Sequence, residues 1–131
     1  MENEQLVRRL LELFGRRELD RAVALFGEAA EFQVPGSSVI SGTYRGRGGV
    51  LELWRRQIEL SSGSFQTKLV ALEPAGDRVV VGIDITAELD GEPVSWRRTV
   101  TYRISGDLIV QATCVEGDQS LADRVFALKH G

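Results

Sequence analysis

The sequence predicts an α+β domain in which helices come first along the chain and then pack on one face of an antiparallel sheet. Apolar residues recur at helical spacing up to about residue 60. After that point, apolar and polar residues alternate between short glycine-containing turns, as in a meander of strands. The 131 residues suffice for one compact domain and are too few for two ordinary ones. We therefore expect residues 1–131 to form a single domain.

Helical periodicity predicts two helices, at residues 3–15 and 18–26, that form a hairpin. A short strand is expected at residues 30–34. The glycine-rich segment 42–49 then leads into a third helix. The apolar side of this third helix carries Val50, Leu53, Trp54 and Ile58.

Four strands are expected after the helices, at residues 65–72, 78–89, 94–104 and 108–116. The dipeptide Asp90-Gly91 is a strong signal for a two-residue hairpin turn and therefore fixes the register of the second and third of these strands. Asp84 and Arg97 then face each other on the outer side of the sheet. The pairs expected on the inner side are Ile85 with Trp96, Ile83 with Arg98, Val81 with Val100, and Val79 with Tyr102.

The turn before the last strand decides which side of that strand faces Arg98. A two-residue loop brings Ile109, Gln111, Thr113 and Val115 to that face, and a three-residue loop brings Leu108, Val110, Ala112 and Cys114. We favour the longer loop because its inward residues are all apolar or small. It places Cys114 opposite Arg98 and Glu116 opposite Trp96, which allows a buried diagonal contact between Glu116 and Arg98.

Arg98 is the sharpest polar anomaly in the chain, because it interrupts an apolar face between Trp96 and Val100. A guanidinium in such a place must be paired, stacked on an aromatic ring, or directed into a wet cavity. The alternative is that Arg98 lies near the sheet edge and extends to water while its stem covers Trp96.

Composition argues against several classes of protein. A formal net charge of −3, with no tract of basic residues, offers no surface for nucleic acid. No apolar run is long enough to cross a bilayer, and no signal peptide is recognisable, so a cytoplasmic protein is expected. The single cysteine, Cys114, and the single histidine, His130, cannot form a metal cluster, so neither a metal nor zinc chemistry is expected.

The stretch "EFQVPGSSVISGTYRGRGGVLELW", followed by the meander and "DLIVQATCVEGDQSLAD", resembles the SnoaL-like polyketide cyclases. These belong to the nuclear transport factor two-like superfamily, which also includes ketosteroid isomerase-like proteins. The resemblance implies a conical α+β barrel, in which a curved sheet encloses a hydrophobic pocket that the helices close. It also implies a homodimer, a small hydrophobic partner from secondary metabolism, and no cofactor. The bend within residues 35–49 would then lie at the mouth of the pocket.

The usual catalytic residues of these relatives are replaced in this chain. The carboxylate base of the isomerases falls on Gln33 or Val34. The isomerases' protonated aspartate and the cyclases' histidine both fall on Val100, and the cyclases' last-strand aspartate falls on Cys114. Epoxide hydrolase-like relatives need an aspartate–arginine–aspartate set, and Asp84 is expected to face outward, so this set is not assembled.

These comparisons leave four catalytic candidates: Arg98, Glu116, Tyr102 and Gln33. Glu116 would be a base near Arg98 or else a surface carboxylate, while Tyr102 and Gln33 would donate hydrogen bonds to a carbonyl that gains negative charge. The leading hypothesis is cofactor-independent cyclisation or isomerisation of a polyketide-like substrate. The alternatives are a non-catalytic dimeric binding module and an epoxide hydrolase-like activity. The residues expected to contact the ligand are Phe14, Phe32, Trp54, Phe65, Trp96, Val100 and Cys114.

Overall fold

The computed structural model describes residues 2–128, which form four helices and one six-stranded sheet. The helices are α1 (Asn3–Gly15), α2 (Leu19–Val23), α3 (Gly46–Leu60) and α4 (Gln119–Val125). The strands are β1 (Phe26–Val34), β2 (Gly42–Arg45), β3 (Gln66–Ala75), β4 (Arg78–Leu89), β5 (Glu92–Ser105) and β6 (Leu108–Glu116).

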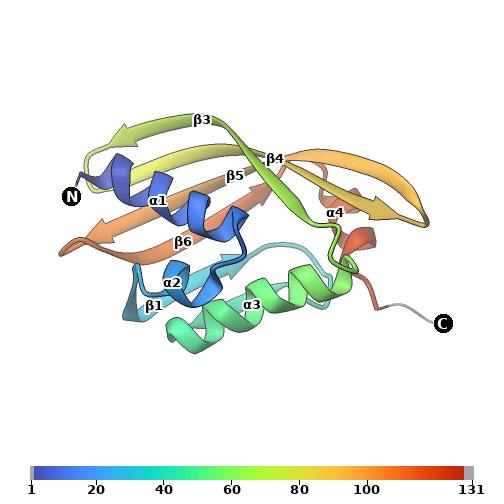
Figure 1. The fold of residues 1–131 in the computed structure, drawn as a ribbon, viewed down its shortest axis with the longest axis horizontal. Helices are drawn as coiled ribbons and strands as arrows, with labels where there is room; N and C mark the ends of the chain where they lie inside the picture. Colours follow the sequence, from blue (N-terminus) through green and yellow to red (C-terminus); the bar gives the residue numbers. More distant parts are fainter. Residues whose placement is uncertain (1, 129–131) are drawn as a thin grey trace.

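The sheet has the strand order β2-β1-β6-β5-β4-β3, and α1, α2 and α3 lie across one of its faces (Figure 1). Every neighbouring pair is antiparallel except β1 and β6, which are parallel. The sheet curves around the helices but does not close, because β2 and β3 are its two edges. The predicted α+β fold, with helices packed on a curved sheet, is confirmed.

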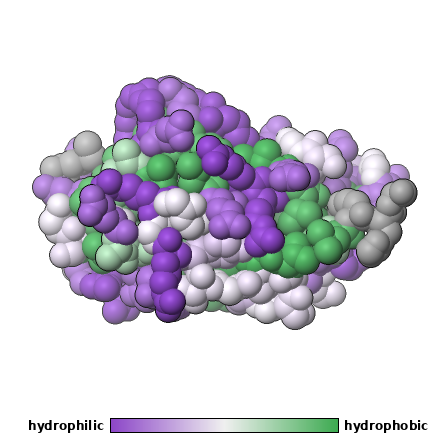
Figure 2. All heavy atoms as spheres, turned by 90° about the horizontal axis from the view of Figure 1, so that it is seen from below, coloured by the Kyte–Doolittle hydropathy of each residue, from purple (hydrophilic) through white to green (hydrophobic). Residues whose placement is uncertain are grey.

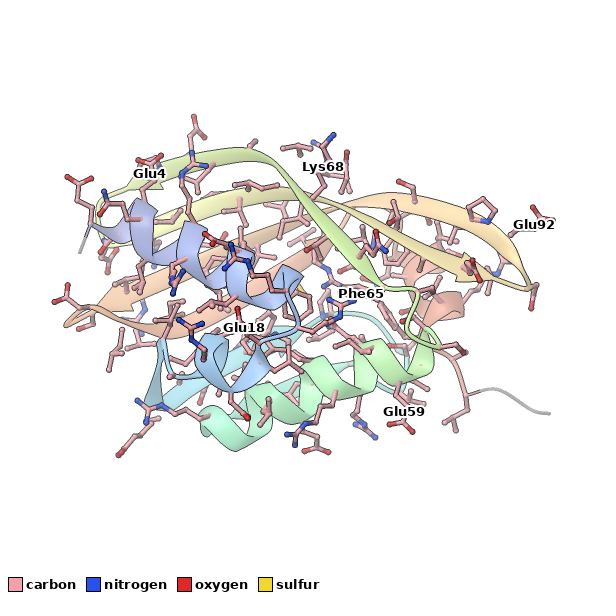
Figure 3. The ribbon with its side chains drawn as sticks, viewed as in Figure 1. Glu4, Glu18, Glu59, Phe65, Lys68 and Glu92 are labelled. Carbon is pink, nitrogen blue, oxygen red and sulfur yellow. The ribbon has the colours of Figure 1, made fainter. Side chains whose placement is uncertain are left out.

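The hydrophobic core fills the space between the helices and the concave face of the sheet. In α1 the buried residues recur every three or four positions, which gives the helix one apolar side: Leu6, Val7, Leu10, Leu13 and Phe14. Figure 3 shows Phe65 directed inward between the helices and the sheet, whereas Lys68, Glu59 and Glu92 lie on the periphery. Seen from below, the surface is mostly hydrophilic, with hydrophobic residues exposed in patches between polar ones (Figure 2).

The region between α2 and β1 differs from its sequence-based prediction. The second helix was expected to continue to Phe26 and end at Gly27, but α2 ends at Val23 and both residues belong to β1. Pairing with β6 overrides the helical spacing here, since the amide of Ile109 donates to the carbonyl of Leu25 over 2.9 Å. The short edge strand β2 was not predicted at all.

The register of the β4–β5 hairpin is confirmed at every predicted pair, including Ile83 with Arg98 and Asp84 with Arg97. Both central turn residues, Asp90 and Gly91, have positive φ, which is typical of a type I′ turn. This turn matches the twist of the flanking strands and therefore holds the long hairpin in register.

The predicted register of β5 with β6 is wrong by two residues beyond the turn. The turn contains two central residues, Gly106 and Asp107, both with positive φ. A β-bulge follows, in which Val110 has no partner between the pairs Ile104–Ile109 and Arg103–Gln111. Ile109 is therefore buried in place of Val110. The bulge then returns Ala112, Cys114 and Glu116 to the Arg98 face, where Cys114 lies opposite Val100 and Glu116 opposite Arg98.

None of the helices within residues 2–128 is long and apolar enough to cross a membrane. Residues 2–128 also contain no group of His, Cys, Asp and Glu side chains that could hold a metal ion. His130, which was weighed as a metal ligand, lies outside the described residues.

Candidate functional site

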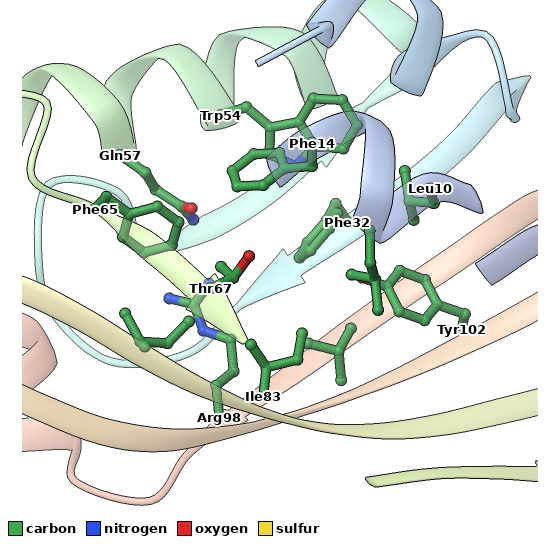
Figure 4. Close-up of a pocket in the computed structure, with 13 residues that line it drawn as sticks. Leu10, Phe14, Phe32, Trp54, Gln57, Phe65, Thr67, Ile83, Arg98 and Tyr102 are labelled. Carbon is green, nitrogen blue, oxygen red and sulfur yellow. The ribbon is translucent and has the colours of Figure 1, made fainter. Parts of the chain in front are cut away.

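A small cavity lies in the core between α1, α3 and the concave face of the sheet (Figure 4). Its volume of about 40 Å³ is well below the roughly 300–1,000 Å³ of pockets that hold drug-sized ligands. Most of its wall is apolar or aromatic. The lining residues are Leu10, Leu11, Phe14, Phe32, Trp54, Gln57, Phe65, Thr67, Ile83, Ile85, Arg98, Val100 and Tyr102.

The cavity adjoins the outside between α1 and the strands β3 and β4. Leu11, Thr67 and Ile83 line both the cavity and a surface groove, which also contains Arg8 and Glu12. None of the residues 35–49 lines the cavity, so the bend expected at its mouth lies elsewhere. A larger guest must move these side chains or extend its body into the groove.

Arg98 is buried at the cavity wall, with a side chain that is 6% exposed. Its Nε donates to Oε1 of Glu116 over 2.5 Å, and the other carboxylate oxygen accepts a hydrogen bond from the indole of Trp96. The Glu116 side chain is only 2% exposed. The structure therefore resolves the alternatives for Arg98: it is paired and buried, and it does not extend to water.

The guanidinium of Arg98 keeps unused hydrogen-bond donors. Within residues 2–128 its Nη2 is buried without a partner, and leaving such a donor unsatisfied costs on the order of 1–3 kcal/mol. Its Cζ lies 5.7 Å from the centroid of the Phe65 ring, a cation–π distance. Arg98 also lines a second cavity of about 10 Å³, close to the space that one water needs. Arg98 thus forms the wall between two cavities.

Gln57 and Thr67 also line the main cavity, and sequence reasoning missed both. Gln57 is 2% exposed, and neither side chain makes a hydrogen bond within residues 2–128. A signal for Gln57 was present, because it lies seven residues after Val50 and shares the buried side of α3 with Val50, Leu53 and Trp54. Thr67 gave no such signal, since threonine is common on both faces of strands.

Six of the predicted ligand and catalytic residues besides Arg98 line the main cavity: Phe14, Phe32, Trp54, Phe65, Val100 and Tyr102. Burial raises the pKa of the Tyr102 hydroxyl far above its ordinary value of 10.0, with a smaller increase from Cys114 and a partial reduction from Arg98. Tyr102 is therefore a protonated hydrogen-bonding group across the physiological pH range.

Four of the predicted site residues do not line the main cavity: Gln33, Trp96, Cys114 and Glu116. Gln33 is half-buried and alternates along β1 with the inward residues Phe32 and Val34, so its side chain lies on the other face of the sheet. Trp96 packs edge-on against Phe126, with ring centroids 6.0 Å apart.

Cys114 is buried in the sheet, and its Sγ donates to the carbonyl of Gln33 over 3.7 Å. Burial raises the pKa of this thiol to about 11, Arg98 opposes the increase, and Glu116 adds to it. A thiol with a raised pKa is a poor nucleophile near neutral pH. Cys114 is therefore a buried core residue rather than a nucleophile.

Two carboxylates away from the cavity have structural partners, and the position of the first agrees with its sequence-based prediction. Asp84 pairs with Arg97 over 2.6 Å on the outer face of the sheet, so it cannot join Arg98 in an epoxide hydrolase-like set. Asp118 caps α4 by accepting a hydrogen bond from the amide of Leu121 over 3.0 Å.

The model of the SnoaL-like domain matches residues 7–112. This chain belongs to the SnoaL-like family. The match covers α1 through most of β6 and therefore includes all residues that line the main cavity. No curated protein sequence matches the chain.

Solved structures with the same fold share less than a quarter of their residues with this SnoaL-like protein. Bal32a, from a soil-derived mobile gene cassette, has a TM-score of 0.87 and 23% identity, over 93% of this chain and 94% of Bal32a. TerC, co-crystallised with polyporic acid, has a TM-score of 0.82 and 15% identity, over 92% and 95% of the chains. A candidate polyketide cyclase from Sinorhizobium meliloti has a TM-score of 0.70 and 16% identity, over 85% and 94%. These similarities establish the fold.

Proposed function

We propose that this SnoaL-like protein is a cofactor-independent enzyme of secondary metabolism that cyclises or isomerises a hydrophobic, polyketide-like substrate in the main cavity. The observation that supports the proposal is the buried guanidinium of Arg98 at the wall of an aromatic-lined cavity. A fixed cation at such a position stabilises negative charge that develops on a substrate carbonyl oxygen. The similarity to a candidate polyketide cyclase, and to TerC with its polyporic acid, is consistent with this substrate class.

In the proposed reaction, different residues at the cavity wall have different roles. Arg98 contacts the substrate oxygen, while Glu116 and Trp96 hold the guanidinium in place. The apolar walls bring the reacting carbons together, which lowers the entropic part of the barrier. No Asp, Glu or His within residues 2–128 lines the cavity, so protons move within the substrate or to water.

The test removes the ion pair as a unit. The double variant Arg98→Met/Glu116→Leu keeps the volume and takes away both charges, a replacement that is often neutral or stabilising for the fold. The matched control is Asp84→Asn/Arg97→Met, which removes a neighbouring pair on the outer face. Planar polyketides and terpenoids are first screened by thermal shift, and turnover is then followed by product analysis. We expect the control to keep turnover and the buried-pair variant to lose it. Equal turnover in both would contradict the proposal.

A non-catalytic binding module is the second candidate, and the absence of a carboxylate or histidine from the cavity lining within residues 2–128 favours it. A module of this kind would bind the screened compounds without converting them. Ligands that raise the unfolding temperature but remain unchanged after long incubation with wild-type protein would support the module over the enzyme.

Two further proposals concern the protein in solution and in the cell, and the first of them rests on the family resemblance. We propose a homodimer, which light scattering at several protein concentrations tests through the molar mass. A mass that remains at the monomer value of 14.5 kDa would contradict it. We also propose a cytoplasmic location, which fractionation of the source cells tests.

A further inference from the structure

Three of the four polar side chains that line the main cavity lie together at one end (Figure 4). Gln57 from α3, Thr67 from β3 and Arg98 from β5 extend toward this end. Tyr102 lies at the other end, beside Phe32 and Leu10. The cavity therefore has one polar end and an otherwise apolar body that also contains Tyr102, which matches a ligand with one main polar head group.

The charge at the polar end is already balanced. Arg98 forms its buried ion pair with Glu116, so a permanently anionic head group would lack a counter-charge of its own. Moving such an anion from water into an apolar cavity costs several kcal/mol unless it is paired. The balance of charge therefore favours a head group that is neutral.

The hydrogen-bonding groups at the polar end further restrict which neutral head groups can bind there. A guanidinium only donates, whereas an amide and a hydroxyl can both donate and accept. Within residues 2–128, the Gln57 and Thr67 side chains make no hydrogen bond, and Arg98 makes one through its Nε only. A head group that accepts from Arg98 and donates to Gln57 or Thr67 would pair with Arg98 and with one of these two side chains.

We propose that the cavity binds molecules with a neutral head group that places a hydrogen-bond acceptor next to a donor, joined to an apolar body. Primary carboxamides and enolised β-dicarbonyls have this chemistry. Gln57 is then a residue that determines specificity, because it distinguishes such head groups from simple ketones and from carboxylates. This inference concerns the same cavity as the proposed function and names the substrate class for it.

Three probes of nearly the same shape test the proposal: benzamide, acetophenone and benzoate. They share a phenyl ring and differ in carrying a neutral acceptor with a donor, an acceptor alone, or an anion. Dissociation constants are measured at pH 7 by titration with ¹⁵N-labelled protein, in which the Gln57 side-chain amide signals report on the polar end. We expect benzamide to bind about tenfold more tightly than benzoate, because the anion cannot donate to Gln57 or Thr67 and must leave water without a counter-charge of its own. Acetophenone should lie between them.

The near-isosteric variants Gln57→Leu and Thr67→Val remove the head-group contacts singly. Each variant should weaken the binding of benzamide more than the binding of acetophenone. Gln33→Leu is the matched control, because Gln33 lies on the other face of the sheet. Benzoate that binds as tightly as benzamide would overturn the inference. Unchanged selectivity in both cavity variants, or no binding of any probe at about 10 mM, would also overturn it.

The outcome separates this inference from the proposed function. Selective binding of benzamide, together with no turnover of any screened compound, would support this inference and contradict the proposed enzymatic function. Turnover of a polyketide, together with tighter binding of benzoate than of benzamide, would support the enzymatic function and contradict this inference.

Discussion

Arg98 and Glu116 stabilise each other at the scale of single residues, because each neutralises a charge that is nearly inaccessible to water. Arg98→Ala should lower the free energy of unfolding by about 3–5 kcal/mol, since it leaves Glu116 buried and unpaired. The comparison is Asp84→Asn, which breaks the exposed pair with Arg97 and should cost less than about 1 kcal/mol. Urea unfolding measures both, and similar losses in the two variants would contradict the buried pairing.

Cys114 should make the stability of the protein depend on pH at high pH. Its pKa is raised from an ordinary value of 9.0 to about 11, so the folded chain holds the thiol proton more tightly than the unfolded chain. This contribution is complete below pH 9 and is lost as the pH rises toward 11. Tyr102, whose pKa is also raised, acts in the same direction. Urea midpoints at pH 8 and pH 10.5 should fall further in the wild type than in Cys114→Ala, and equal declines would contradict this account.

The sequence predicted Arg98 as the key residue because a charge on an otherwise apolar strand face is rare and has few physical solutions. Gln57 was not predicted as a site residue, because Arg55 and Arg56 directly before it suggested a solvent-exposed turn of α3. The roles of Glu116 and Gln33 could not be fixed from the sequence. Each depends on which face of a strand the backbone presents, and bulges change that face without a clear signature in the residues.

The bend before β2 and helix α4 form a contact at the scale of structural elements. Gly36 has a φ of +94°, and a Cβ at this position would meet the Gln119 amide and lie 2.7 Å from the Asp123 carboxylate. Gly36→Ala should therefore destabilise the protein by about 1–3 kcal/mol, mainly from backbone strain, because the atoms that the new Cβ would meet are the ends of two side chains that can shift. The bend and α4 together line the second, smaller cavity beside Arg98.

Gly48→Ala is the matched control for this contact. Gly48 lies in α3, where an added Cβ would meet nothing within 4 Å and where alanine favours the helix. The control should be neutral or stabilising by up to about 1 kcal/mol. Equal effects of the two substitutions on the urea midpoint would contradict the strained backbone described at Gly36.

At the scale of elements, the sequence predicted β4 and β6 with their observed bounds, because short glycine-containing turns precede both strands. The strand expected at residues 30–34 forms the second half of β1, but the prediction failed at residues 24–29 and 42–45, where tertiary pairing decides the structure. The strand β1 begins with helix-compatible residues, and β2 is too short to show a period. The strand β1 pairs with β6, which lies far away in the sequence, and β2 pairs with β1.

The whole molecule should unfold locally from the edges of its sheet inward. β5 lies between β4 and β6 and carries buried residues such as Val100 and Tyr102, whereas β2 is a four-residue edge strand. Amide hydrogen exchange under native conditions should therefore be slower in β5 than in β2 by more than roughly a hundredfold, because local openings cost far less than global unfolding. Similar rates in the two strands would contradict a single cooperative core centred on β5.

The bulge at Val110 has a consequence for how such proteins diversify. Deletion of this one residue would join Ile109 to Gln111 in a regular ladder and leave Ala112, Cys114 and Glu116 on the inner face. If Val110 were instead paired regularly, Val115 would turn inward and Glu116 would turn out to water. Two homologues that differ in length by one residue at this point can therefore keep the same buried ion pair, because the bulge absorbs the difference locally.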